Sequence, residues 1–114
     1  MEDYILREIR KITMVLEALV KKTAAHPDEG YTIIRQELIQ ELALDIDEVM
    51  ICDDPVRILI ENGFSNEEMD ALASLLLSVK GSMSMYRHGQ VEILNNHIRG
   101  HFKSEGYLSL ALWQ

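Results

Sequence analysis

The region from Ser65 to Lys103 has the most regular alternation of hydrophobic and polar positions in the chain. Steps of three and four residues place the hydrophobic side chains of its first half on one helix face: Met69, Leu72, Leu76, Val79, Met83 and Tyr86. The second half repeats the pattern at Val91, Leu94, Ile98 and Phe102. The spacing predicts two antiparallel helices, joined by a tight turn at Tyr86 to Gln90 that contains Gly89.

The start of this predicted hairpin is marked by two independent signals. Ser65 and Glu68 have the spacing of a capping box, in which each side chain accepts a hydrogen bond from the other residue's backbone. Phe64, just before the cap, can contact Met69 as a hydrophobic staple. We therefore predict that the helix starts at Ser65.

The first forty residues predict another pair of helices. A long hydrophobic stripe from Asp3 to Lys22 contains Ile5, Ile9, Ile12, Leu16 and Leu19, with Leu6, Val15 and Val20 at its margins. A shorter one between Tyr31 and Ala43 contains Tyr31, Ile34, Leu38 and Leu42. The turn between them is predicted at Thr23 to Glu29. The long stripe can face its own core or an identical helix of a second chain, and its own core is favoured because only about three heptads are present.

The segment between the two hairpins carries helix boundary signals. Asp45 or Asp47 can cap a short helical turn that carries Val49, Met50 and Ile51. Asp54 before Pro55 predicts a helix start, and Asn62-Gly63 predicts its end. The resulting helix, Pro55 to Glu61, is predicted to bridge the two hairpins.

These patterns together predict the fold class. A chain of 114 residues with 47% hydrophobic content is the size of one folded domain. We predict a single all-α domain over residues 1–114, a bundle of five to six helices built from two antiparallel hairpins.

Composition narrows the classes of partner and compartment. The net charge of −8 and the lack of a basic cluster with interleaved aromatic residues argue against nucleic acid as a partner. No run of about 18 uninterrupted apolar residues occurs, so neither a membrane span nor a signal peptide is expected. A single cysteine, Cys52, cannot form an internal disulfide. The expected location is cytoplasmic.

Charge is distributed unevenly along the chain. Residues 41 to 70 contain ten acidic side chains and one basic one, Arg57, whereas the predicted second hairpin is mildly basic. The two regions can attract each other within one chain or between chains. The simpler interpretation, that both are solvated surfaces, is favoured because exposed charges contribute little to stability.

The last residues of the sequence are unusually apolar for a segment that follows a helix. Exposing them to water would be unfavourable, so they are expected to pack on their own domain or, as the less favoured alternative, on another subunit. The candidate interaction residues are Tyr107, Leu108, Leu110, Leu112 and Trp113.

His97 and His101 are the only candidate metal ligands with a suitable spacing. Four residues apart on one helix, both imidazoles project from the same side and can share a metal ion. Ile98 stands where a zinc protease would have its glutamate base, and a third ligand would have to be His88, Glu92, Cys52 or Glu37. A partly buried, hydrogen-bonded imidazole is the favoured interpretation.

Both predicted turns contain a glycine, in Glu29-Gly30-Tyr31 and His88-Gly89-Gln90. This arrangement resembles the helical hairpin of the tetratricopeptide repeat, although His101 stands where that unit prefers a small residue. Two imperfect units are too few for a solenoid, so a closed bundle is expected. The whole chain is also similar to a family of small bacterial all-helical proteins of unknown function. The segments that carry this resemblance are Asp3-Tyr4-Ile5-Leu6, Gly30-Tyr31, Leu42-Ala43-Leu44-Asp45-Ile46-Asp47 and Leu75-Leu76.

The functional expectation follows from the absence of a catalytic motif in the sequence. We expect a non-enzymatic protein-interaction or assembly module that forms a homodimer, without a cofactor. The alternative is a metal- or small-ligand-binding helical protein that uses His97 and His101. An enzyme ranks last, since only those two histidines could support one.

Overall fold

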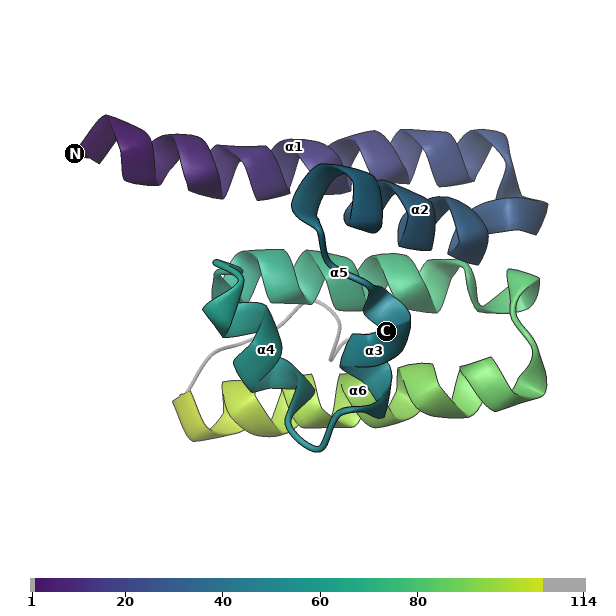
Figure 1. Ribbon diagram of the computed structural model, residues 1–114. Coiled ribbons are helices and arrows are strands. Elements are labelled where there is room, and N and C mark those ends of the chain that lie inside the picture. Colours follow the sequence, from purple (N-terminus) through teal and green to yellow (C-terminus); the bar gives the residue numbers. More distant parts are fainter. Residues whose placement is uncertain (1, 106–114) are drawn as a thin grey trace.

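The computed structural model describes the backbone of residues 2–105 and the side chains of residues 11–104. In this part of the chain, all regular secondary structure is helical, which confirms the predicted all-α class (Figure 1). The elements are α1 (Glu2–Ala25), η1 (Pro27–Glu29), α2 (Gly30–Leu42), α3 (Ile46–Ile51), α4 (Pro55–Glu61), α5 (Asn66–Ser78), η2 (Lys80–Ser82) and α6 (Met85–Glu105).

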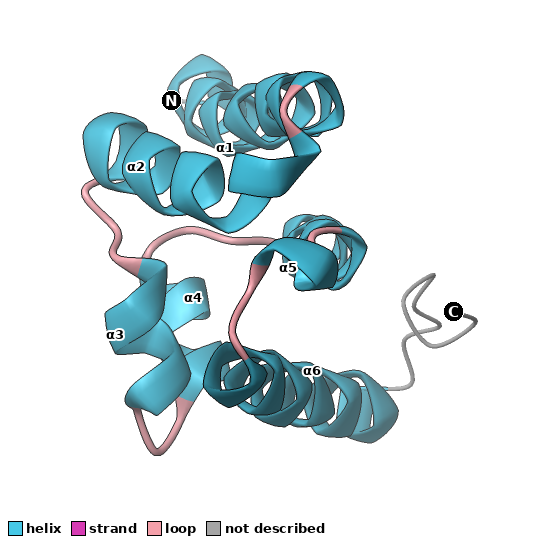
Figure 2. Ribbon diagram, turned by 90° about the vertical axis from the view of Figure 1, so that its right-hand side faces the viewer, coloured by secondary structure: helices cyan, strands magenta, loops and turns pink. Residues whose placement is uncertain are grey.

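The helices form two antiparallel pairs, α1 with α2 and α5 with α6, and α1 also packs against α5. Figure 2 shows α1, α5 and α6 stacked on one side of the bundle, with α2, α3 and α4 on the other. The sequence predicts that the helix after Pro55 bridges the pairs. The structure gives much of this role to α3, which contacts both α2 and α6, while α4 packs on α3 and α6.

One hydrophobic core runs through both pairs. It collects the stripe positions that the sequence assigns to the helix faces, because a helix with one apolar face must bury that face against another element. The largest side chains with less than 2% exposure are Leu19, Ile34, Leu38, Ile46, Val49, Leu59, Met69, Leu72, Leu76, Leu94, Ile98 and Phe102.

The predicted capping box at the start of α5 is present. The backbone N–H of Glu68 donates to Ser65 Oγ at 3.2 Å, and the Ser65 N–H donates to Glu68 Oε1 at 3.0 Å. Phe64 and Met69 are both buried, as a staple requires. Glu68 does more than the sequence indicates, since its Oε2 accepts a hydrogen bond from Thr13 Oγ1 at 2.9 Å and so connects α5 to α1.

The boundaries of α3 and α4 are also as predicted. Of the two candidate caps for α3, Asp45 is the one used, and its carboxylate accepts from the Asp47 N–H at 3.0 Å. Asp54 accepts from the Arg57 N–H at 3.3 Å at the start of α4. Gly63 follows α4 with φ of 92°, a left-handed conformation that favours glycine.

The predicted position of the second hairpin turn is wrong. Helix α5 ends at Ser78, and the connection through η2 leads to α6 at Met85, so Tyr86 to Gln90 lie inside α6. The helix start is capped by Ser84, whose Oγ accepts from the Arg87 N–H at 3.2 Å. Tyr86 is 73% exposed and does not belong to the buried stripe. The regular spacing of hydrophobic residues continues past Ser78 because Val79 and Met83, which lie in the connection between α5 and α6, also pack on the core.

Gly30 is required for close packing rather than for a turn conformation. It is the first residue of α2 and has right-handed helical dihedrals. A β-carbon built there would lie 2.6 Å from Val79 Cγ1 and 2.7 Å from Val79 Cβ. Val79 begins the α5–α6 connection, so the absent side chain is what allows the two hairpins to approach each other.

Replacing Gly30 with alanine is therefore expected to destabilise the protein, although alanine is the better helix former. We expect a loss of about 1–3 kcal/mol in the free energy of unfolding, the usual effect of overpacking. Urea titration monitored by circular dichroism measures it. Gly89→Ala is the matched control, because a β-carbon there meets no atom within 4 Å. An equal or larger loss for Gly89→Ala would contradict the packing role of Gly30.

Candidate interaction groove

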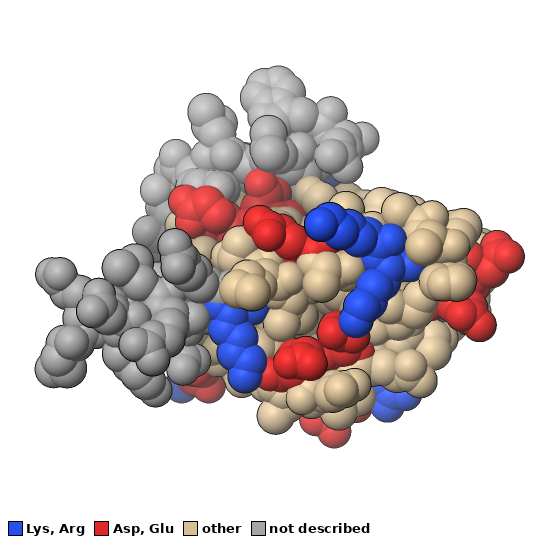
Figure 3. Space-filling view, turned by 90° about the horizontal axis from the view of Figure 1, so that it is seen from above, with Lys and Arg blue, Asp and Glu red and all other residues tan. Residues whose placement is uncertain are grey.

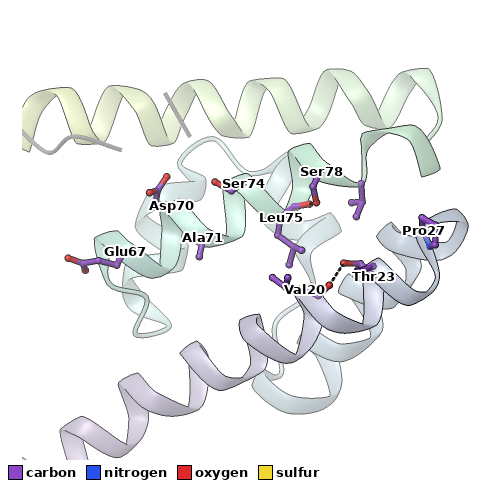
Figure 4. Close-up of a pocket in the computed structure, with 11 residues that line it drawn as sticks. Val20, Thr23, Pro27, Glu67, Asp70, Ala71, Ser74, Leu75 and Ser78 are labelled. Carbon is purple, nitrogen blue, oxygen red and sulfur yellow. Dashed lines mark hydrogen bonds between the residues drawn. The ribbon is translucent and has the colours of Figure 1, made fainter. Parts of the chain in front are cut away.

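An open groove with a volume of about 780 Å³ lies between α1 and α5. The residues of α1 and η1 form one wall and those of α5 and its C-cap form the other (Figure 4). The groove is lined by Val20, Thr23, Ala24, Pro27, Glu67, Asp70, Ala71, Ser74, Leu75, Ser78 and Val79.

Small side chains explain why the groove exists. On α5, Ala71, Ser74 and Ser78 follow one another at helical spacing and line the groove together. Ala24 lines it from α1. Because these side chains are short, they do not fill the space between α1 and α5 on this side of the two helices.

The groove continues toward the middle of α1. A second cavity of about 230 Å³ shares Val20, Glu67 and Ala71 with the first, and it also contacts Leu16 and Glu17. Figure 4 shows Val20 and Leu75 pointing toward one another across the groove. Val20 is 55% exposed, so part of this aliphatic side chain faces solvent. The sequence placed Val20 at the margin of the buried stripe, and the structure places it on the groove wall.

Acidic side chains occupy one end of this surface, and the other end is apolar. Glu17 and Glu67 lie at the shared end of the two cavities, and Val79 and Pro27 lie at the far end. Thr23 lines the apolar part, but its hydroxyl already donates to the Leu19 carbonyl oxygen of its own helix at 2.8 Å. The groove thus offers hydrophobic contact along most of its length.

A polar cluster on the other side of the bundle connects three helices. Asp47 of α3 accepts a hydrogen bond from the Tyr31 hydroxyl of α2. Its Oδ1 also accepts from Arg87 Nη1 of α6 at 2.9 Å. The Arg87 guanidinium lies 4.8 Å from the centroid of the Tyr31 ring, a cation–π distance. Gln90 Oε1 accepts a further hydrogen bond from Arg87 at 3.1 Å.

The cluster extends to Arg35 of α2. Arg35 Nε lies 3.1 Å from Asp45 Oδ1 and 3.2 Å from Asp47 Oδ2. The hydrogen bond from Arg35 lowers the pKa of the Asp45 carboxyl. Two carboxylates and two guanidinium groups contact one another here, so opposite charges connect α2, α3 and α6. The Asp47–Arg87 pair joins one residue of the acidic middle of the chain to one residue of the basic hairpin.

The environment of Tyr31 makes the free energy of unfolding depend on pH in the alkaline range. Burial, followed by the hydrogen bond to Asp47 and the charge of Asp47, raises the pKa of the Tyr31 hydroxyl. An acid whose pKa is raised by folding stabilises the fold below its unfolded pKa, which is about 10 for tyrosine. That contribution is lost as the pH rises from about 10 through the folded pKa.

We therefore expect the free energy of unfolding to fall above a pH of about 10. Tyr31→Phe is expected to be less stable at neutral pH and to show a shallower alkaline fall, because it lacks the group that must ionise. Tyr86→Phe is the control, since this side chain is exposed. Denaturant titrations across the alkaline range measure both slopes. An identical slope in wild type and Tyr31→Phe would show that Tyr31 is not the titrating group.

The two candidate metal ligands lie on one side of α6 but in different environments. His97 is exposed, whereas His101 is partly buried with Nε2 3.3 Å from Asn66 Oδ1. This contact agrees with the favoured interpretation of His101 as a hydrogen-bonded structural imidazole. Within the described residues, no group of three His, Cys, Asp or Glu side chains is placed to hold a metal ion. His88, one proposed third ligand, donates from Nε2 to the Lys80 carbonyl oxygen. Metal binding by His97 and His101 stays a prediction.

The predicted interaction residues Tyr107, Leu108, Leu110, Leu112 and Trp113 lie outside the described residues. The groove and the Asp47 cluster were not predicted. One signal for the groove was present, because Ala71, Ser74 and Ser78 recur on one face of a helix whose other face is fully apolar. The signal for the cluster was the opposite charge of the two regions that it joins.

The charged surface of the described chain is mixed. On the face seen from above α1, Lys and Arg side chains lie among Asp and Glu side chains and uncharged ones (Figure 3). Among the described helices, none is both long and apolar enough to cross a membrane.

Comparisons with protein family models, with curated proteins and with solved structures gave no match. The resemblance to a small bacterial family and to tetratricopeptide-like hairpins therefore stays a prediction.

Proposed function

We propose that this chain is a non-enzymatic protein-interaction module that associates with a second copy of itself through the α1–α5 groove. The observation that carries this proposal is the open groove of about 780 Å³, whose apolar wall includes the exposed Val20. Water in such a groove contacts hydrophobic side chains, and a second protein surface would remove that contact.

The groove wall itself supports a self-complementary contact. Val20 of α1 is 55% exposed and lines the groove, so it can contact a second copy. In a two-fold dimer the same patch faces itself, and a ridge on one copy meets a groove on the other. Val20 of one copy would then lie against Ala71 of the second.

The alternative classes have less support. The charged groups around Asp47 already contact one another across α2, α3 and α6. The histidine pair has no third ligand among the described residues. Neither observation supports catalysis or metal binding, whereas the groove offers a surface that a second protein can contact.

Sedimentation equilibrium of the full chain from low to high micromolar concentration tests the proposal. The informative variant is Ala71→Arg, which places a long charged side chain at the junction of the two cavities. We expect wild type to dimerise and Ala71→Arg to dimerise at least about tenfold more weakly, since desolvating an unpaired charge is costly. Gln36→Arg on the exposed surface of α2 is the control and is expected to behave as wild type.

Ala71 is exposed, so its replacement is expected to leave the fold intact, and circular dichroism checks this. A monomer at all concentrations would overturn the proposal. An equal dimerisation constant for Ala71→Arg and Gln36→Arg would also overturn it, because the groove would then play no part in association.

A further inference from the structure

We propose that a polar pocket between α5 and α6 binds a small hydroxylated carboxylate of the sugar-acid class. The pocket has a volume of about 520 Å³, which lies in the range of small-molecule sites. It shares only Ser78 with the α1–α5 groove, and it goes beyond the proposed function. The pocket is lined by Leu77, Ser78, Lys80, Glu92, Asn95, Asn96 and Arg99.

Asn95 carries a buried amide whose hydrogen bonds are incomplete. The residue is only 7% exposed, and its Oδ1 has no hydrogen-bond partner among the described residues. Buried polar atoms in proteins nearly always have a partner, and leaving one unpaired costs stability. Because the amide can rotate about its Cβ–Cγ bond, a ligand in the pocket can reach this oxygen. A hydroxyl group of the ligand would supply the missing donor.

Arg99 supplies the positive charge of the pocket. It follows Asn95 by one turn on the same side of α6, and its Nε is buried without a hydrogen-bond partner in the described part of the chain. The acid in the pocket lining is Glu92, whose Oε1 already accepts from Lys80 Nζ at 3.1 Å. The charge of Arg99 is therefore not balanced within the lining. A planar guanidinium suits a carboxylate, because two parallel N–H groups can donate to its two oxygens.

The opposite end of the pocket favours hydroxyl groups. Glu92 and Lys80 lie there, and Glu92 is about 10 Å from Arg99 along α6 at the rise of an α-helix. Leu77 and Ser78 belong to the C-terminal end of α5, whose carbonyl groups carry partial negative charge. An anion is disfavoured beside these carbonyl groups, and an ammonium group is disfavoured beside Lys80. Uncharged hydroxyl groups, which both donate and accept, suit this end.

The ligand that matches both ends carries one carboxylate and several hydroxyl groups on a short carbon chain. Its carboxylate would contact Arg99, and its hydroxyl groups would contact Asn95 and the Lys80–Glu92 pair. Asn96 is exposed, so the pocket opens to solvent on this side. The ligand can therefore enter without movement of a helix.

Isothermal titration calorimetry of the full chain with three six-carbon probes tests the ligand class. Gluconate has a carboxylate and hydroxyl groups, hexanoate has only the carboxylate, and sorbitol has only the hydroxyl groups. We expect gluconate to bind with a dissociation constant of about 1 mM or below, and the other two probes to bind at least about tenfold more weakly. Absence of gluconate binding, or equal binding of hexanoate or sorbitol, would overturn the proposal.

Two variants locate the site, Arg99→Gln and Asn95→Leu. Each is expected to weaken gluconate binding by at least about tenfold, because each leaves a group of the ligand without its partner. Arg57→Gln is the matched control, since it removes the same charge from an exposed side chain of α4. It is expected to bind gluconate as wild type does. Wild-type affinity in Arg99→Gln or Asn95→Leu would overturn the assignment of the pocket.

The stability of Asn95→Leu separates a ligand-binding role from a structural one. Leucine has nearly the same size and lacks the unpaired oxygen, so we expect the ligand-free variant to melt at the wild-type temperature or above it. Gluconate is expected to raise the melting temperature of wild type and not that of the variant. A lower melting temperature for ligand-free Asn95→Leu would assign the amide to the fold and overturn its role in binding. These experiments measure ligand binding, so their failure leaves dimerisation through the α1–α5 groove untouched.

Discussion

Leu59→Ala is expected to lower the free energy of unfolding by about 3–5 kcal/mol. Leu59 lies in the short helix α4 and is completely buried, with 0% exposure. Its removal takes a large aliphatic group out of a core shared by both helix pairs, and the loss combines the transfer free energy of that group with the cost of the cavity left behind. A short helix owes its stability to such contacts, because an isolated helix of this length is unstable in water.

Thermal unfolding measures the effect, and in a domain of this size we expect a decrease of about 10–20 °C in the melting temperature. Ile60→Ala is the matched control, since Ile60 is the next residue of the same helix and is 46% exposed. Its expected loss is below about 1 kcal/mol. Similar losses for the two variants would show that α4 is not held by its buried face.

The fold could be predicted from sequence where the signals were local. The capping box at Ser65 and Glu68 and the Asp54-Pro55 boundary depend on residues within one helical turn of each other, so a single sequence contains all the information. The stripe around Leu72 and Leu76 is likewise a property of one helix. Each of these predictions agrees with the structure.

The turn between α5 and α6 was misplaced because hydrophobic periodicity does not show where a helix stops. Val79 and Met83 continue the rhythm of the stripe, yet they pack on the core from a connection that includes η2. Gly89 appeared to mark the turn, but it lies in α6 with open space around it. Ser84, which caps α6, was the correct local signal.

The candidate site depends on tertiary distances that periodicity does not contain. The width of the α1–α5 groove is set by how closely two helices approach, and this depends on side chains from both, such as Ala24 and Ala71. The Asp47–Arg87 pair joins residues forty positions apart. The uneven distribution of charge along the sequence indicated that acidic and basic regions could attract each other. Which residues pair depends on the packing of α3 on α6.

Asp47→Ala is the second prediction with a large expected effect. One carboxylate serves three donors, the Tyr31 hydroxyl, Arg87 Nη1 and Arg35 Nε, and these donors come from two helices other than its own. Its removal leaves the partly buried Arg87 and the buried Tyr31 hydroxyl without this acceptor. We expect a loss of about 2–3 kcal/mol in the free energy of unfolding, because hydrogen bonds to charged groups are the stronger ones and buried donors are costly to leave unpaired.

Urea titration of Asp47→Ala measures this loss, and Glu48→Ala is the control, because Glu48 is an exposed acid in the same first turn of α3. The control is expected to change stability by less than about 0.5 kcal/mol. A double-mutant cycle with Arg87→Ala isolates the pair, and a coupling energy of about 1 kcal/mol or more is expected for groups in direct contact. Since both side chains are about a quarter exposed, water offsets part of the loss. A coupling energy near zero would mean that α3 and α6 are held together by hydrophobic contact alone, with the Asp47 cluster as a consequence of the fold rather than one of its causes.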